Sequence, residues 1–301
     1  MRNHNEDSSE NRYVMNRIIT VDEGKCIRCR ACVRVCPAEI FIQEDITKVP
    51  VAEQIESCIV CGHCMGVCPS DAVAHSDFPA DKVHPLEDDK LPTPEEVMLL
   101  IRSRRSGRVF SGKPVPEDKL GTILEAAHRA PTGSNVQQTD FTLVTDPEVL
   151  KKISEYTLGV FGRVLKMLKN PLLKPILKAM MPQVYGMIPK FERMQEEFAE
   201  GKDGILRGAA AVLFIHTPSS DRFGSADANL SYQNASLMAQ ALGVGHFYTG
   251  FVLAAMRQDK NKRLNKILGI DGEVHAGMAM GVPSVKFVNY IDRKELKVRR
   301  I

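Results

Sequence analysis

The stretch "CIRCRACVRVCP" at residues 26–37 is followed by a second copy of its pattern, "CIVCGHCMGVCP", at residues 58–69. Both copies read Cys-x2-Cys-x2-Cys-x3-Cys-Pro. Together they contain all eight cysteines of the 301-residue chain. The repeat therefore determines what the amino-terminal part of the chain binds and how that part folds.

Three kinds of cysteine chemistry compete for this pattern. Disulfides are disfavoured, because no signal peptide is expected and cysteines this close in sequence make strained pairs. Zinc sites also use paired Cys-x2-Cys units, but one zinc ion needs only four thiolates. The spacing with its trailing proline is typical of iron–sulfur ligation in bacterial ferredoxins. We therefore predict two [4Fe–4S] clusters.

Each cluster is expected to take three ligands from one copy and the fourth from the other. Three thiolates close in sequence wrap a cubic cluster from three sides, and the last corner faces the other copy. Two ligand sets follow: Cys26, Cys29, Cys32 and Cys68 for one cluster, and Cys58, Cys61, Cys64 and Cys36 for the other. Both clusters then link the repeats, which matters because roughly 60 residues bury too little apolar surface to be stable alone.

Residues 15–80 resemble the two-cluster bacterial ferredoxins. In this resemblance, Pro37 and Pro69 turn the chain after each fourth ligand. Gly62 either keeps the backbone close to the cluster or forms an ordinary tight turn, and His63 is interpreted as a surface histidine. Thiolates that hold reduced iron imply a reducing cytoplasm.

The chain is too long for a ferredoxin alone, and its length predicts a second domain. We expect a disordered start at 1–14, a ferredoxin-like domain at 15–80, a linker at 81–92 and a second domain at 93–301. A hydrophobic content of 44% supports a sizeable core. No apolar run approaches the roughly 18 residues that span a bilayer, so no transmembrane segment is expected.

Charge differs between the two parts of the chain, although the net charge is only +3. Residues 1–80 carry 8 Lys or Arg against 12 Asp or Glu, and the remainder carries 32 against 25. The basic surplus favours a phosphate-bearing cofactor and solvated faces. A nucleic-acid partner is not expected, because no matching motif and no dense basic tract accompany it.

Helices and strands alternate in the second domain. Thr93-Pro94-Glu95-Glu96 is a capping box with proline at the first helical position, so a helix is predicted from Pro94 to Ser103. Further helices are predicted over 116–129, after Asp146 and over 226–242 with Gly243 as its stop, and strands over 141–145, 210–217 and 274–282.

A nucleotide-binding motif of the common kinds is missing. "GVGHFYTG" at 243–250 follows a helix and misplaces the third glycine of a Rossmann fingerprint. "GRVFSGKP" at 107–114 ends in Pro114, where a P-loop needs the hydroxyl that holds magnesium. The cofactor of this domain must therefore be held in another way.

"RSRRSGRVF" at 102–110 gathers arginines and one hydroxyl at a helix end. Arginine suits phosphate because it makes bidentate contacts. "RAPTGSNVQ" at 129–137 is a polar loop after the next helix. Together the two stretches resemble the nitroreductase family of flavoenzymes, over about residues 94–298. That resemblance implies an α+β sandwich, with a mixed sheet and flanking helices, that forms a homodimer with FMN at its interface.

The resemblance also implies the residues that contact FMN. "LGVGHFYTGF" at 242–251 resembles the family segment that passes the flavin N5 atom, and "GVPSVKFVNYIDRK" at 281–294 resembles its basic tail. Gln138 stands where a proline is usual and Val282 where an aromatic is usual, so the pocket shape stays open. The implied FMN contacts are Arg104, Arg105, Ser106, Arg108, Pro131, Thr132, Asn135, Gln137, Thr249, Gly250 and Arg293 or Lys294.

The two parts together predict an FMN-dependent oxidoreductase. Iron–sulfur clusters move electrons singly, whereas a flavin takes electrons one at a time and delivers two as a hydride. We expect a small electron-poor acceptor, of nitroaromatic or quinone type, and a donor that is ferredoxin, NADH or NADPH. The alternatives are an electron-carrier subunit that serves a protein partner, and a flavin-dependent dehydrogenase or dehalogenase. The sequence singles out no catalytic side chain.

A basic, Met-rich segment at 160–194 carries seven Lys or Arg, one Glu and five Met. Its charges fall near helical spacing. Four interpretations stay open: a substrate lid, a membrane-surface helix, a docking face for an acidic electron carrier, and a helical dimer wall with a solvated face.

Overall fold

The structure is a computed structural model that describes residues 17–301. The predicted disordered start at 1–14 lies outside the described residues. The chain forms two compact units. The first runs to Leu91 and includes Ser134–Val136, and the second contains Pro92–Gly133 and Gln137–Ile301. The domain boundaries predicted from the sequence stay predictions.

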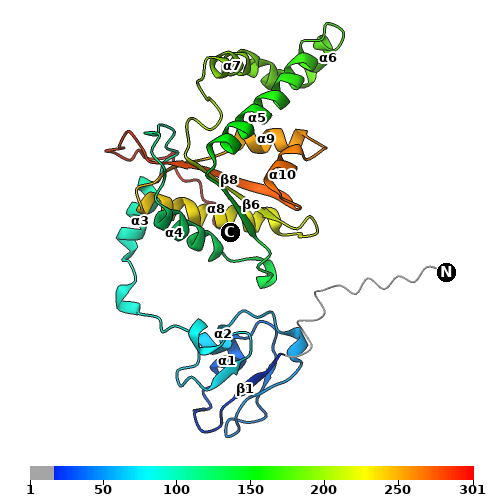
Figure 1. The fold of residues 1–301 in the computed structure, drawn as a ribbon. Coiled ribbons are helices and arrows are strands. Elements are labelled where there is room, and N and C mark those ends of the chain that lie inside the picture. The colour runs from blue at the N-terminus through cyan, green and yellow to red at the C-terminus, as the bar shows by residue number, and fades with distance from the viewer. Residues whose placement is uncertain (1–16) are drawn as a thin grey trace, which may run out of the picture. The chain divides into compact units, whose positions relative to one another are not determined.

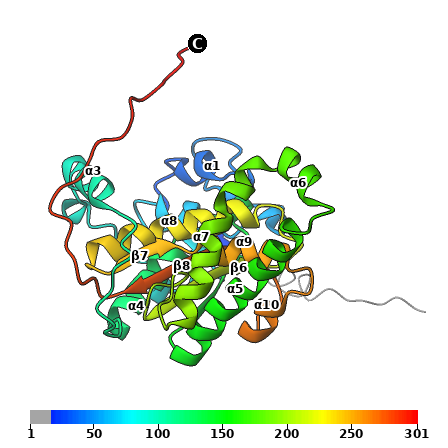
Figure 2. The ribbon, with the colours of Figure 1, turned by 90° about the horizontal axis from the view of Figure 1, so that it is seen from above.

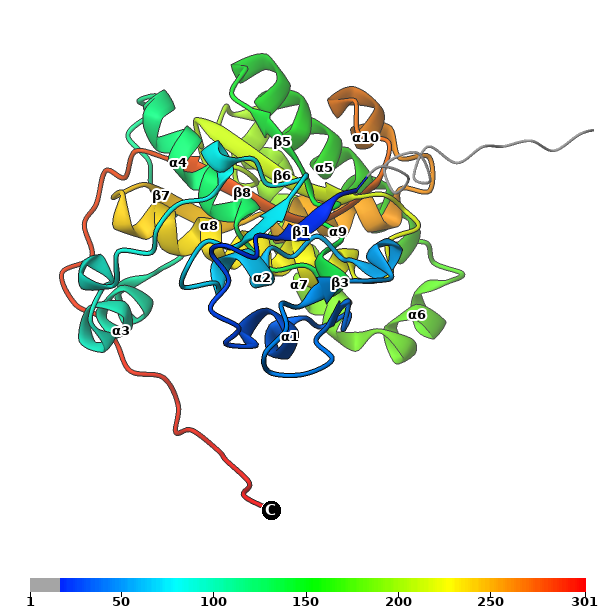
Figure 3. The same cartoon turned by 90° about the horizontal axis from the view of Figure 1, so that it is seen from below.

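The first unit is built from two short antiparallel strand pairs and one helix in each cysteine motif. β1 (Ile19–Val21) pairs with β4 (Val73–His75), so a strand before the first motif joins a strand after the second. β2 (Phe41–Ile42) pairs with β3 (Val51–Ala52). The helices α1 and α2 are visible beside β1 in Figure 3. The remaining elements are α1 (Ala31–Val35), η2 (Ile55–Ser57), α2 (His63–Gly66), η3 (Ala80–Lys82) and η4 (Asp88–Lys90).

The core of the first unit is small and includes ligand candidates. Cys32 and Cys64 are buried in one cluster with Ile19, Ile40 and Phe41. Partly buried side chains pack against this cluster, and three of them are the further cysteines Cys36, Cys58 and Cys68. The sulfur atoms are therefore part of the core itself.

The second unit is built on a four-stranded antiparallel sheet in the order β5-β6-β8-β7. β6 lies inside it, and Ala211 to Ile215 are completely buried. The buried strand predicted over 210–217 is confirmed. The strands are β5 (Asp140–Val144), β6 (Ala211–Thr217), β7 (Gly245–Tyr248) and β8 (Glu273–Gly281).

Helices cover both faces of this sheet. Successive side chains of a strand point to opposite faces. Val212 and Phe214 of β6 face the core under α5 (Pro147–Leu168) and α9 (Gly250–Gln258). Leu213 and Ile215 face the core under α4 (Glu117–His128) and α8 (Gly224–Ala241). Figure 1 shows these helices on the two sides of the sheet, so the predicted α+β sandwich is confirmed.

The predicted helix starts are confirmed by hydrogen bonds. Thr93 Oγ1 accepts from the Glu96 amide at 3.2 Å, and Glu96 Oε2 accepts from the Thr93 amide at 2.8 Å. This capping box begins α3 (Pro94–Ser103). Asp146 Oδ1 accepts from the Glu148 amide at 2.8 Å and begins α5. α8 ends before Gly243, whose φ of 69° only glycine adopts freely.

The basic, Met-rich segment is not one continuous helix. α5 ends at Leu168, and two more helices follow, α6 (Lys174–Met180) and α7 (Pro182–Ala199). Proline ends a helix or begins the next, and Pro171, Pro175 and Pro182 stand at these breaks. Figure 1 shows α6 near the end of α5, and α7 packs against α5. The last described helix is α10 (Arg263–Leu268), and η5 (Gly133–Asn135) lies in the loop after α4.

None of the helices within residues 17–301 is long and apolar enough to cross a membrane. After β8, residues 285–301 are exposed and form neither helix nor strand, as the red trace in Figure 2 shows.

A fragment of residues 92–301 is expected to fold without the first unit, because its two core clusters draw only on its own residues. Its melting temperature by circular dichroism should lie within about 5 °C of that of the same unit in the full chain, a shift of roughly 1–2 kcal/mol at this size. The matched fragment 17–91 should unfold when iron is withheld. Non-cooperative melting of 92–301 would contradict the division into two units.

Candidate active site and metal centres

The eight cysteines line two cavities in the first unit. Cys26, Cys29, Cys32 and Cys68 face one cavity. Cys36, Cys58, Cys61 and Cys64 face the other. These are the two crossed sets predicted from the repeat. Each cavity therefore takes three sulfurs from one copy and one from the other.

The donor set fits a cluster better than a single ion. Among residues 17–301, no group of three or more His, Cys, Asp or Glu converges closely enough to hold one metal ion. The four sulfurs of each set surround a space instead of meeting at a point. A tetrahedral zinc site needs sulfurs about 2.3 Å from a common centre, whereas a [4Fe–4S] cube presents four separate irons.

The backbone repeats along with the cysteines. Residues with positive φ in the first copy recur 32 positions later in the second: Arg28 and Val60, Arg30 and Gly62, Glu39 and Asp71. Such turns point amide groups toward an enclosed anion. The Val60 amide donates to Cys58 Sγ at 3.4 Å, and the Ala72 amide donates to Cys68 Sγ at 3.2 Å. Hydrogen bonds of this kind stabilise the negative charge on cluster sulfurs.

His75 is a functional candidate that the sequence analysis missed. The Asp77 amide donates to His75 Nδ1 at 3.1 Å, so the proton of the neutral ring lies on Nε2. Nε2 lies 3.6 Å from Cys58 Sγ and donates toward it. Burial lowers the pKa of His75, so the ring stays neutral and keeps this tautomer at neutral pH. The signal in the sequence was a histidine at a buried position of β4, between Val73 and Asp77.

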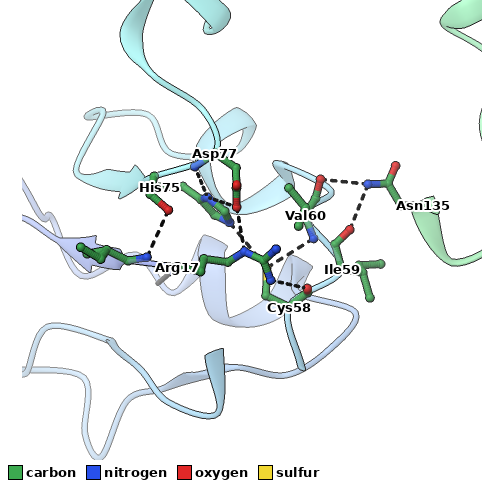
Figure 4. Close-up of polar contacts among 9 residues, drawn as sticks. Arg17, Cys58, Ile59, Val60, His75, Asp77 and Asn135 are labelled. Atoms are coloured by element: carbon green, nitrogen blue, oxygen red, sulfur yellow. Dashed lines mark hydrogen bonds and ion pairs between the residues drawn. The ribbon is translucent and has the colours of Figure 1, made fainter. Parts of the chain in front are cut away.

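Arg17 links the same two residues, Asp77 and Cys58, by hydrogen bonds. Its Nε donates to Asp77 Oδ2 at 2.7 Å and its Nη1 to the Cys58 carbonyl at 3.0 Å. Figure 4 shows Arg17, Asp77 and His75 around Cys58. Asn135, which groups with the first unit, donates from Nδ2 to the carbonyls of Ile59 at 3.0 Å and Val60 at 2.8 Å (Figure 4). The amide of Asn135 thus binds the loop of the second cysteine copy.

Burial raises the pKa of the Cys64 thiol to about 11. Without metal this thiol is protonated at neutral pH, and iron binding displaces its proton. His63, beside it, is exposed, as expected of a surface histidine. Gly62 has a φ of 71° and begins α2.

In the second unit, the arginines after α3 have no acidic partner among residues 17–301. Arg105 donates to the Ile291 carbonyl at 3.2 Å, and Arg108 donates to the Ser106 carbonyl at 3.4 Å. The Arg108 guanidinium also lies 5.7 Å from the centre of the Phe247 ring. Arg104 ends α3 and forms no ion pair. Guanidinium groups without carboxylates nearby leave their charge available for an anion.

A cavity of about 750 Å³ lies between α5, α7 and α9. Its walls are mainly aromatic, methionine and aliphatic side chains, and Arg108, Lys190 and Arg207 supply its cations. The Lys190 ammonium lies 5.0 Å from the centre of the Phe251 ring. Arg108 also lines a second cavity, of about 670 Å³, together with Arg105 and Tyr290.

Thr249 and Gly250 lie at the wall of the 750 Å³ cavity. Thr249 is 2% exposed, and its Oγ1 has no hydrogen-bond partner among residues 17–301. A buried polar atom without a protein partner is costly and is available for a hydrogen bond to a bound molecule. Gly277 of β8 makes room for this hydroxyl, because an added Cβ would lie 2.3 Å from it.

The other predicted FMN residues lie on the loop after α4 and after β8. Thr132 Oγ1 accepts from the Gln137 amide at 3.0 Å, whereas Pro131 is exposed. Gln137 has a φ of 51°, a strained conformation that costs about 1–3 kcal/mol and is common at functional sites. Arg293 and Lys294 are exposed in the segment after β8. Of the predicted FMN residues, the structure thus brings Arg108, Thr249 and Gly250 to this cavity. The others do not line it: Arg104, Arg105, Ser106, Pro131, Thr132, Asn135, Gln137, Arg293 and Lys294.

Two family matches divide the chain in the same way. Residues 101–282 match the nitroreductase family. Residues 25–73 match the 4Fe–4S dicluster domain.

Similar proteins are redox enzymes. An Archaeoglobus fulgidus protein named for NADH dehydrogenase/NAD(P)H nitroreductase activity is 26% identical over 63% of this chain and 86% of its own length. The FMN reductase [NAD(P)H] of Bacillus subtilis is 28% identical over 52% of this chain and 55% of its own length. A Bacteroides fragilis nitroreductase structure with bound FMN matches the fold with a TM-score of 0.51, at 20% identity, over 68% of this chain and 99% of that one.

Crossed ligation predicts which cavity each fourth cysteine serves. Cys68→Ala should perturb the cluster of Cys26, Cys29 and Cys32, and Cys36→Ala should perturb the other, with roughly half of the iron lost in each case. Electron paramagnetic resonance of the reduced proteins distinguishes the two. Loss of the same signal in Cys68→Ala and in Cys64→Ala would show uncrossed ligation.

His75→Phe removes the Nε2 donor to Cys58 and should lower the reduction potential of that cluster. The expected shift is on the order of 60 mV if the bond is stronger by about 1.4 kcal/mol in the reduced state. A redox titration followed by electron paramagnetic resonance measures it. His63→Phe is the matched control, because this exposed histidine donates to no sulfur among the described residues, and an equal shift in both variants would contradict the role of His75.

Proposed function

Since the chain belongs to the nitroreductase family, we propose that it is an FMN-dependent oxidoreductase that reduces a small electron-poor molecule of nitroaromatic or quinone type. Electrons reach it singly, through two [4Fe–4S] clusters. One observation carries this proposal: Arg108 and Thr249 lie at the wall of the apolar cavity, and the Thr249 hydroxyl has no hydrogen-bond partner among the described residues. The FMN unit is proposed to span residues 93–301.

The residues present fit FMN. When bound, FMN would supply two-electron chemistry with organic molecules while accepting electrons one at a time. Arg104, Arg105 and Arg108 would bind its phosphate and ring edge, since they have no acidic partner among the described residues. The Thr249 hydroxyl, which has no hydrogen-bond partner among the described residues, would form a hydrogen bond with the flavin ring. The remaining contacts predicted from sequence are proposed with them: Ser106, Pro131, Thr132, Asn135, Gln137, Gly250 and Arg293 or Lys294.

Two cavities with four cysteines each fit two clusters. The clusters would supply one-electron transfer to the flavin unit. The protein holds them with thiolates and tunes them with amide and His75 donors to sulfur.

The cavity also supports the substrate class. Flat rings pack well against aromatic side chains, and Phe161, Phe191 and Phe251 lie in mutual ring contact at its wall. Lys190 and Arg207 would bind the carbonyl or nitro oxygens of such a ring and stabilise the charge that develops on them. An electron-carrier subunit needs no open cavity of this size, so the cavity favours an enzyme. The segment 160–194 would then supply one wall of the substrate site.

We propose a homodimer for the same unit. α3 has no buried residue, and its Leu99 and Ile101 are 58% and 47% exposed. After β8, Val288 and Leu296 are 82% and 89% exposed. Apolar surface of this extent is expected to be covered by a second copy of the chain.

Arg104→Ala and Arg108→Ala are expected to weaken FMN binding about tenfold to hundredfold, because a charge-assisted hydrogen bond contributes roughly 1.5–3 kcal/mol. Fluorescence titration of the flavin-free protein with FMN measures the dissociation constant. Lys152→Ala, an exposed change on α5, is the control. Unchanged FMN affinity in both arginine variants would tell against this placement.

The function itself is tested by anaerobic turnover. With reduced methyl viologen as the electron source, the protein should reduce menadione, which takes two electrons from the donor and two protons from water. Lys190→Ala should raise the KM for menadione severalfold with FMN content unchanged. No turnover with menadione or with a nitroaromatic, in protein loaded with flavin and iron, would refute the proposed substrate class.

A further inference from the structure

The two cysteine loops share their backbone but not their charge. Residues 24–38 carry Lys25, Arg28, Arg30 and Arg34 and no acidic residue, whereas residues 57–69 carry no Lys, Arg, Asp or Glu. The surrounding unit is acidic, because residues 17–91 contain 13 Asp or Glu against 8 Lys or Arg. Half of the basic residues of this unit thus lie in the ten positions from Lys25 to Arg34.

These four cations point into solvent. All four residues are exposed, Arg28 and Arg30 lie on turns with positive φ, and Arg30 borders the cavity of Cys26, Cys29 and Cys32. Cys29 is itself exposed, whereas its counterpart Cys61 is half-buried. An electron that enters or leaves near Cys29 therefore crosses little protein.

The four charges are also outside salt bridges, although Asp22, Glu23 and Glu39 flank the loop in sequence. Among residues 17–301, the side chains of Lys25, Arg28, Arg30 and Arg34 make no ion pair. Most other basic residues of the unit do: Arg17 pairs with Asp77, Lys48 with Glu44 and Lys90 with Glu87. A unit that neutralises its other cations and leaves these four free presents a local positive field.

We propose that the loop from Lys25 to Arg34 is the docking surface for an acidic one-electron carrier protein, which delivers electrons at the cavity of Cys26, Cys29, Cys32 and Cys68. This rests on the proposed function, whose electron donor it specifies. Each encounter oxidises the carrier by one electron and reduces this protein by one electron. Two encounters balance the two-electron reduction of a quinone, which takes its two protons from water.

The chemistry of the loop fits a brief encounter. Ile27 is 63% exposed in the middle of the cations, so the surface has an apolar centre and a charged rim. Redox partners use small interfaces of this kind and separate quickly. Opposite charges raise the association rate by about 10 to 1,000-fold, and salt screens the effect within about 8 Å at physiological ionic strength.

Binding to an acidic plant-type [2Fe–2S] ferredoxin tests the proposal. Both proteins are kept oxidised, in the full chain, and the dissociation constant is measured by calorimetry at low salt. The variant R28Q/R30Q/R34Q should bind about tenfold to hundredfold more weakly than wild type. K48Q/K82Q/K90Q removes the same number of charges elsewhere in the unit and should bind within about twofold of wild type. Iron content and the visible spectrum establish that the clusters are intact.

The salt dependence gives a second measurement that needs no variant. Wild-type binding should weaken at least about tenfold on moving to 0.5 M salt, where the three proteins should become alike. Equal weakening by both triple variants, or no ferredoxin binding by wild type, overturns the proposal. Binding of a single-stranded DNA that depends on Arg28, Arg30 and Arg34, without ferredoxin binding, would assign the surface to nucleic acid and also overturns it.

Turnover separates this proposal from the proposed function. R28Q/R30Q/R34Q should reduce menadione at the wild-type rate from reduced methyl viologen, a small donor that needs no docking surface, and more slowly from reduced ferredoxin. If wild type fails with methyl viologen, the proposed function fails, and the ferredoxin dissociation constants still decide the docking surface.

Discussion

The first unit depends on one constraint, that four sulfur atoms must face each of two cavities from two separate parts of the chain. Cys68 and Cys36 satisfy it by crossing between the copies, so neither cavity can form unless both repeats are in place. The pairing of β1 with β4 follows, because it brings the start of one repeat to the end of the other. The apolar core is too small to impose this arrangement alone. Folding and binding of the proposed clusters would therefore be one event in this unit, since the thiols proposed to bind iron also fill its interior.

The second unit is held together by a different interaction, burial of β6 on both faces. That strand carries no polar side chain from Ala211 to Ile215, and helices remove both of its faces from water. A core of this kind needs no cofactor, so it leaves the edge of the sheet free for chemistry. β7 and the start of α9 then place Thr249 and Gly250 at a cavity wall, where a rigid scaffold supports a polar atom without a partner. Rigid elements position site residues better than loops do.

Local patterns in the sequence predicted much of this structure, and contacts distant in sequence account for what was missed. The capping box of Thr93, the cap of Asp146 and the buried strand β6 are set by neighbouring residues, and each is confirmed. The helix breaks after Leu168 were missed because basic periodicity was weighed above the prolines. His75 was missed because its role depends on Cys58, which no local pattern indicates. Asn135 was predicted only as an FMN contact, and its hydrogen bonds to Ile59 and Val60 were missed for the same reason. β7 was overlooked because its short "GHFY" run was compared with glycine and flavin-binding motifs and not with a strand pattern.

The repeat also explains why the two proposed clusters need not have the same role. A duplicated motif starts with two equal sites, and side chains that are not ligands are free to diverge. In the first copy, the positions between the ligands hold Arg28 and Arg30, whereas the second holds Val60 and Gly62 at the same turns. The copies thus share the backbone conformation at these turns and differ in the side chains that the turns carry. His75 adds a donor to a sulfur of the second set, which favours its reduced state. In the proposed electron path, the charge outside the first cavity and the hydrogen bond at the second would act in one direction: both would favour arrival of an electron at the first cavity and its passage to the second.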